Sequence, residues 1–288
     1  MGLNFSETPE ILNFVIAGQV SGGHKLLAEA LNSYELDDHP SPLTCHSVLL
    51  SENPAVRRYY HEVYFGPSGN TPDWLVEGHI SGEQYLTNKI FDNALLGEKA
   101  IGVCVIYKHM YDRDLWDYFL NWCRSGDFCL INLNRNPFSC FACIKLWERN
   151  NFFLRDVPSA PYQAYTDVVG APCPYYSHFP ATSAPVHISV SEAIDFARAH
   201  VAANQKSASM CDDRLEVGYE ELVGNFYRTS EEILRFLDLP LNHHWSVRWT
   251  RYFQELESVP LRRMIANWDS LCSQLPPDLK ELADPGAL

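Results

Sequence analysis

The chain has 288 residues, of which 46% are hydrophobic and 20% charged, enough for one large domain or two small ones with a full core. Its formal net charge of −14 excludes a protein that holds nucleic acid on a basic surface. We expect neither a signal peptide nor a membrane span, which needs roughly 18 consecutive apolar residues. Nine cysteines without a secretion signal predict free thiols in a reducing cytoplasm.

The first predicted elements are a strand, a glycine loop and a helix. Residues 14–16, Phe-Val-Ile, form a short apolar run typical of a buried parallel strand. Gly18, Gly22 and Gly23 follow, and residues 25–31 carry leucines and an alanine at helical spacing. A glycine loop that opens a helix exposes backbone N–H groups and the positive end of the helix dipole. This stretch is therefore a candidate phosphate-binding site.

The loop departs from the Walker pattern, Gly-x-x-x-x-Gly-Lys-Ser/Thr. Gly18 and Gly23 have the required spacing, but His24 stands where the lysine belongs. Lys25 comes one residue late, and Leu26 follows it where Ser or Thr would hold Mg²⁺. On this stretch alone two interpretations stay open, a phosphate loop and a structural strand-to-helix turn.

A second strand is predicted after a long irregular stretch. Prolines and glycines interrupt residues 35–80, whose aromatic residues favour loops that cover a pocket. A helix is predicted over residues 81–95, and residues 99–109 form a buried strand that ends in Lys108 and His109. Ligands sit at the carboxyl edge of open α/β sheets, so both side chains are candidates for a site.

A third strand, residues 128–133, places an arginine at the same predicted edge. It runs into Arg135, and a helix begins near Pro137. Cys140 and Cys143 then form a Cys-x-x-Cys pair, but no second pair stands near it at zinc spacing. We therefore interpret these two cysteines as small helix residues.

The second half continues the alternation of strand and helix. A Pro- and Tyr-rich excursion is predicted over residues 151–185, and a short strand over residues 215–219. The other predicted helices cover residues 115–123, residues 191–204 with Ser191 as N-cap, residues 229–237 and residues 261–268. We predict a single α/β domain over residues 1–288, in which helices flank a central, mainly parallel sheet, with loop insertions at about 35–80 and 151–185.

Three pieces, in order, resemble the family of sulfotransferases that use 3′-phosphoadenosine-5′-phosphosulfate (PAPS). They are the glycine loop, the strand ending in Arg135-Asn136-Pro137, and Leu215-Glu-Val-Gly-Tyr-Glu-Glu-Leu222 followed by residues 229–239. The last piece is the most specific, being similar to the family's Val-x-Tyr-Glu-Asp-Leu and Thr-x-x-x-Ile-Leu-x-Phe-Leu segments. Residues 261–268 look like its final Arg-containing stretch. The likeness spans residues 11–268 and implies a P-loop-like fold.

The resemblance implies a role for each matching residue. The 5′-phosphosulfate would be held by the loop residues Ser21, Gly22, Gly23 and His24. Arg135 would bind the 3′-phosphate, with Arg262 or Arg263 closing over it. Tyr219 would lie near the adenine. His109 stands where many small-molecule members of the family have a general base.

Two positions depart from the family pattern. Val20 occupies the place just before the Ser-Gly of the loop, where the family usually has Lys or Arg, and Lys25 or Lys108 is the expected replacement. Cys143 stands eight residues after Arg135, where the family usually has Ser. A thiol is a poorer hydrogen-bond donor than a hydroxyl, so this change weakens the expected 3′-phosphate site.

We therefore expect a cytoplasmic enzyme that transfers a sulfuryl group from PAPS to a hydroxyl or nitrogen of a small acceptor, with no metal required. The acidic balance and the aromatic stretches 59–74 and 161–179 favour a cationic or aromatic acceptor, such as a guanidinium alkaloid. Two alternatives stay open. One is a catalytically silent homologue that binds PAPS or its product PAP, as Val20 and Cys143 favour. The other is a P-loop nucleotide kinase. The sequence makes no prediction of oligomeric state.

Overall fold

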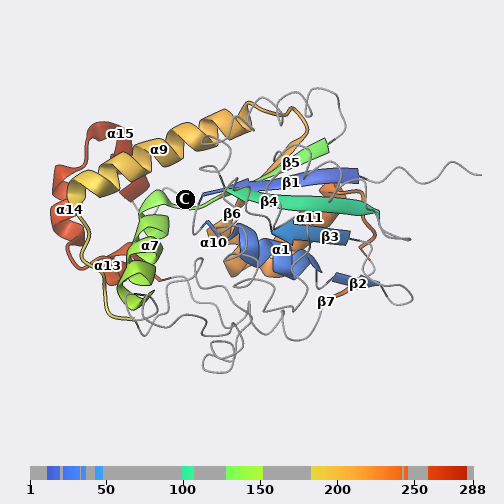
Figure 1. The fold of residues 1–288 in the computed structure, drawn as a ribbon, viewed down its shortest axis with the longest axis horizontal. Helices are drawn as coiled ribbons and strands as arrows, with labels where there is room; N and C mark the ends of the chain where they lie inside the picture. The colour runs from blue at the N-terminus through green and yellow to red at the C-terminus, as the bar shows by residue number, and fades with distance from the viewer. Residues whose placement is uncertain are drawn as a thin grey trace, which may run out of the picture.

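The computed structural model describes residues 12–19, 22–32, 34–36, 43–47, 99–106, 128–151, 183–241, 243–245 and 259–283. Within these ranges five strands form one sheet in the order β3-β4-β1-β5-β6, and every neighbouring pair is parallel (Figure 1). The strands are β1 (Leu12–Gly18), β3 (Leu43–Ser47), β4 (Ala100–Ile106), β5 (Phe128–Asn134) and β6 (Arg214–Gly218). The predicted parallel sheet flanked by helices is confirmed.

β1 lies at the centre of the sheet and forms its most buried part. Its residues 14–17 have no exposed surface, as the apolar run predicts for a strand covered on both faces. The register aligns the carboxyl ends of the strands, since Gly18 pairs with both Ile106 and Leu133. Asn134 in turn pairs with Gly218 at the end of β6. The segments that follow these strands therefore leave the sheet at one edge.

One face of the sheet is covered by α1 (His24–Asn32), α10 (Tyr219–Gly224) and α11 (Phe226–Phe236). Alternate residues of β5, among them Ile131 and Leu133, join this core. The residues between them, Asn132 and Asn134, contact α9 (Val190–Ala208), which lies over the opposite face (Figure 1).

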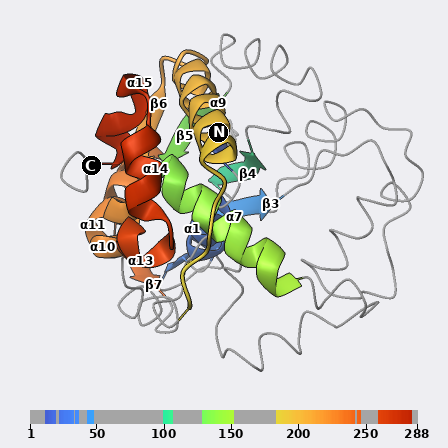
Figure 2. The same ribbon diagram turned by 90° about the vertical axis from the view of Figure 1, so that its left-hand side faces the viewer.

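A second apolar cluster lies beside the carboxyl edge. It joins α7 (Pro137–Asn151) and part of α9 to α13 (Leu261–Met264), α14 (Trp268–Gln274) and α15 (Pro277–Lys280). Figure 2 shows these three short helices along one side of α7, with α9 next to them. A short 3-10 helix, η3 (Glu281–Ala283), follows α15. No helix in the described ranges is long and apolar enough to cross a membrane.

Several predicted boundaries were wrong. Residues 35–80 are not wholly irregular, because they contain β3 and most of β2 (Tyr34–Leu36), which pairs antiparallel with β7 (His243–Trp245). These short strands exist through partners distant in sequence, which local propensity does not reveal. The helices predicted over residues 81–95 and 115–123 lie outside the described residues.

Three further boundaries differ in the C-terminal half. Tyr219 begins α10 instead of ending a strand, and α11 starts at Phe226, three residues before the predicted helix start at Thr229. Ser189, not Ser191, is the N-cap of α9, and its hydroxyl accepts a hydrogen bond from the Glu192 N–H.

The helix predicted over residues 261–268 is interrupted. Ile265 leaves the helix to form a parallel bridge with Val186, and α14 begins only at Trp268. The Asn267 side chain continues this pairing, because its Oδ1 accepts from the Ile188 N–H at 3.0 Å and its Nδ2 donates to the Ile188 carbonyl at 2.8 Å. A tertiary backbone partner thus overrides the helical pattern.

Candidate functional site

The glycine loop joins the end of β1 to the start of α1 and comes very close to its neighbours. Gly23 has a φ of +96°, a conformation that favours glycine, and a Cβ there would lie 2.4 Å from Cδ2 of Tyr219. A Cβ on Gly22 would lie 2.7 Å from the Gln19 carbonyl oxygen, which accepts the Gly22 N–H. Both glycines are required by the packing, and they lead into the N-terminal end of a nine-residue helix.

A buried arginine lies beside this loop. Arg135 follows the last residue of β5, and only 6% of its surface is exposed. Its guanidinium carbon lies 3.9 Å from the centre of the Tyr219 ring. Tyr219 follows the last residue of β6, and β5 and β6 pair in parallel up to Asn134 and Gly218. The strand register therefore makes Arg135 and Tyr219 neighbours.

The backbone after Arg135 is held by Asn136. Its Oδ1 accepts from the Phe138 N–H at 2.9 Å and from the Ser139 N–H at 3.3 Å, which caps the first turn of α7. Its Nδ2 donates to the Leu282 carbonyl at 2.6 Å. Pro137 takes the first helical position, where its missing N–H costs nothing. The Arg-Asn-Pro sequence thus sets where β5 ends and where α7 begins.

Cys143 reaches the arginine from α7. Burial raises the pKa of the Cys143 thiol, and the charge of Arg135 and a hydrogen bond from it oppose this only in part. Burial likewise raises the pKa of Cys140, one turn earlier in the helix. Both thiols are consequently neutral at pH 7. Neither of them forms a disulfide.

Arg135 keeps its charge despite burial. Burial alone would lower its pKa, but the negative charge carried by the ionised forms of Cys143, Tyr219, Cys140 and Glu220 raises it above the ordinary value. Because the thiols and the phenol are neutral at pH 7, the cluster of Arg135, Cys143 and Tyr219 carries a permanent positive charge. Such a cluster beside a helix N-terminus favours an anion with several negative charges.

The structure brings some predicted residues together and not others. Gly23, Arg135, Cys143 and Tyr219 form one cluster, with Gly22 in the adjoining turn. His24 is the first residue of α1 and is half-buried. Arg262 and Arg263 are exposed on α13, and Arg262 Nη2 lies 3.9 Å from Asp269 Oδ1. The other residues discussed for the site lie outside the described residues: Val20, Ser21, Lys108, His109 and the side chain of Lys25.

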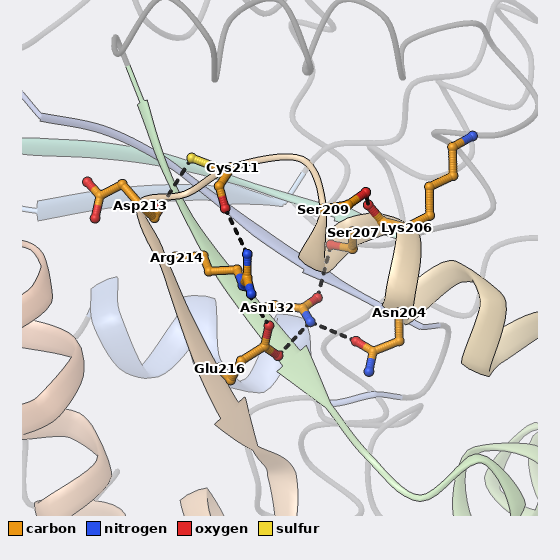
Figure 3. Close-up of polar contacts among 9 residues, drawn as sticks. All are labelled: Asn132, Asn204, Lys206, Ser207, Ser209, Cys211, Asp213, Arg214 and Glu216. Carbon is orange, nitrogen blue, oxygen red and sulfur yellow. Dashed lines mark hydrogen bonds and ion pairs between the residues drawn. The ribbon is translucent and has the colours of Figure 1, made fainter.

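Sequence reasoning missed a polar seam between β5 and α9 (Figure 3). Asn132 is fully buried, and its Nδ2 donates to Asn204 Oδ1 and to Glu216 Oε2, each at 2.7 Å. Its Oδ1 accepts from the Ser207 hydroxyl at 3.0 Å. The signal was present in the sequence, since two asparagines interrupt the otherwise apolar strand of residues 128–134. These contacts hold α9 and β6 against β5, the strand that Arg135 follows.

His200 extends this seam toward the carboxyl edge. Its Nε2 lies 3.3 Å from Oδ1 of Asn134, the residue before Arg135, and only 3% of its surface is exposed. Burial lowers the pKa of His200 to about 4, so the ring is neutral at pH 7. In α9 it lies on the buried face with Ala197 and Ala203, each three positions away, so helical spacing was the signal for its burial in the sequence.

Comparison with known proteins finds similarity at the level of structure. No protein-family model matches the chain, and no curated protein matches it in sequence. A sulfotransferase from Alicyclobacillus acidocaldarius is 14% identical, with 96% of this chain and 95% of that chain covered and a TM-score of 0.48. A sulfotransferase from Mycobacterium avium is 12% identical, with 92% of this chain and 75% of that chain covered and a TM-score of 0.42. A mouse sulfotransferase complexed with PAP is 14% identical, with 97% of this chain and 77% of that chain covered and a TM-score of 0.36.

Proposed function

We propose that this chain is a PAPS-dependent sulfotransferase that acts on a small acceptor. The observation that carries the proposal is the buried Arg135 guanidinium, stacked on Tyr219 beside the Gly22-Gly23 loop at the carboxyl edge of a parallel sheet. The residues involved are those of the three sequence pieces that resemble the PAPS-using family. Chain segments far apart in sequence thus supply one cationic, glycine-lined site.

The residues present fit a nucleotide with phosphates at both ends of its ribose. The 5′-phosphosulfate would be held at the start of α1, by backbone N–H groups of the glycine loop together with the Ser21 hydroxyl. Arg135 can donate two parallel N–H bonds to the 3′-phosphate, with Cys143 as a weaker donor beside it. PAPS, when bound, supplies the sulfuryl group and a phosphate leaving group.

The remaining work of the chain is proton transfer and charge stabilisation. We assign His109 as the base that accepts the proton of the acceptor hydroxyl or amine, since a histidine can do so near neutral pH. Lys25 or Lys108 would neutralise the charge that develops on the leaving phosphate. Arg262 or Arg263 would close over the 3′-phosphate, which requires movement of an exposed side chain. No metal is needed for these steps.

The proposed acceptor is a small cationic molecule, such as a guanidinium alkaloid. The formal net charge of −14 and the aromatic stretches 59–74 and 161–179 support this choice. The proposed location is a reducing cytoplasm, in keeping with the thiols of Cys140 and Cys143, which form no disulfide.

Thermal unfolding with nucleotides tests the proposal. The desulfated product PAP, which is 3′,5′-adenosine bisphosphate, at about 100 times its dissociation constant and without metal, should stabilise the protein by roughly 2.7 kcal/mol. Arg135→Ala should abolish this stabilisation. Arg228→Ala is the matched control, since Arg228 is an exposed arginine of α11 paired with Glu232, and it should leave the stabilisation unchanged.

The other outcomes separate the alternatives. Stabilisation by Mg-ATP alone would favour a nucleotide kinase and overturn the proposal. Stabilisation by the bisphosphate without transfer of labelled sulfate from PAPS to any acceptor in a screen of amines, guanidines and phenols would identify a silent homologue.

A further inference from the structure

Tyr219 lies between the two parts of the anion site. On the edge of its ring, the backbone of Gly23 comes so close that a Cβ there would be 2.4 Å from Cδ2 and 2.8 Å from Cε2. On the face of the ring, the Arg135 guanidinium carbon is 3.9 Å from the centre. The residue is only 5% exposed. The same aromatic ring therefore touches the loop after β1 and the arginine after β5.

We propose that Tyr219 is a positioning residue. Its ring sets the place and orientation of the Arg135 guanidinium relative to the glycine loop. This rests on the proposed function for the identity of the ligand, a nucleoside bisphosphate. Arginine carries several rotatable bonds, so its planar fork discriminates between ligands only when its orientation is held. A ring held against Gly23 on one side and under the guanidinium on another supplies that restraint.

The ring, and not the hydroxyl, makes these contacts. The guanidinium lies over the face of the ring, where it is attracted by the π electrons. Within the part of the chain that the structure describes, the Tyr219 hydroxyl has no hydrogen-bond partner. Burial raises the pKa of Tyr219 to about 12 against the opposing effect of Arg135, so the phenol is neutral. Phenylalanine should therefore replace tyrosine in this role, whereas leucine should not.

The test is the ratio of affinities for 3′,5′-adenosine bisphosphate and 5′-AMP, measured by calorimetry. The two ligands differ in the 3′-phosphate, so their ratio reports how well Arg135 is placed. Tyr219→Phe should keep the ratio within about threefold, and Tyr219→Leu should reduce it about 10- to 30-fold, the range expected for a desolvated cation–π contact. Tyr227→Leu, at an exposed tyrosine of α11, is the matched control and should not change the ratio.

A merely structural role for the ring gives a different result. In that case Tyr219→Leu would have a lower melting temperature and would bind both nucleotides more weakly by the same factor, so the affinity ratio would not change. This outcome overturns the inference. Equal loss of the ratio in Tyr219→Phe and Tyr219→Leu overturns it as well, because the hydroxyl would then be the active group.

Failure of the proposed function is separately visible. If the unchanged protein binds neither nucleotide, the proposed function is wrong, and the positioning role is decided by the Arg135 Nε–H resonance in ¹⁵N-labelled protein, assigned with Arg135→Lys. A ring-current displacement of this signal that is present in the unchanged protein and Tyr219→Phe but lost in Tyr219→Leu supports the role. An unchanged signal in Tyr219→Leu overturns it.

Discussion

At the scale of single residues, His200 makes stability depend on pH. Burial lowers its pKa from the ordinary 6.5 to about 4. The unfolded chain therefore binds a proton below pH 6.5 that the folded chain refuses until about pH 4, and the folded state loses stability as the pH falls through this window. Because the folded-state pKa of His200 is the lower one, its contribution to stability is complete above pH 6.5 and is lost as the pH falls from 6.5 toward 4. Between pH 7 and pH 5 the expected loss is about 2 kcal/mol.

The measurement is urea unfolding at pH 7 and pH 5 for the unchanged protein and His200→Gln. Glutamine keeps a hydrogen-bonding group that can reach Asn134 but does not titrate. The variant should lose about 2 kcal/mol less than the unchanged protein between the two pH values. Equal losses in both proteins would show that other groups cause the acid sensitivity.

At the scale of secondary-structure elements, the junction of β5 and α7 depends on Asn136. This residue is 5% exposed, caps α7 and also binds the Leu282 carbonyl. Asn136→Ala should therefore cost about 2 kcal/mol, the upper range for a cap, because it also leaves buried backbone groups without partners. Ser189→Ala removes the cap of α9 at an exposed position and should cost about 1 kcal/mol or less.

Denaturant unfolding of both cap variants measures this difference. Asn136→Ala should in addition weaken the binding of 3′,5′-adenosine bisphosphate more than Ser189→Ala does, because Arg135 directly precedes the capping residue Asn136. If the two variants lose the same stability, the bond to Leu282 contributes nothing beyond an ordinary cap.

At the scale of the whole molecule, the net charge governs the approach of ligands. A formal charge of −14 attracts a cationic acceptor and repels an anionic one. We expect the KM for a guanidinium acceptor to rise several-fold between about 20 mM and 200 mM salt, as the Debye length shortens from roughly 20 Å to 7 Å. The KM for a neutral phenol should stay nearly constant. Sulfation of phenols and sugars but not of cations would contradict the proposed acceptor class.

Much of the fold could be predicted because its signals are local. The apolar run at residues 14–16 lies in β1, and Pro137 begins α7, as its preference for the first helical turn implies. Ser189 and Ser191 are equally good caps by residue type, so only the folded chain distinguishes them. The break at Ile265 was not predictable either, since it depends on Val186, nearly 80 positions away in the sequence.

The sequence by itself determined that Arg135 follows a buried strand and that glycines open a helix, because alternation, helical spacing and turn chemistry act between residues close along the chain. Only the tertiary structure decided that Tyr219 lies against both Arg135 and Gly23. That contact follows from β5 lying between β1 and β6 in parallel register. Strand order is settled by packing between distant segments, which no local pattern encodes.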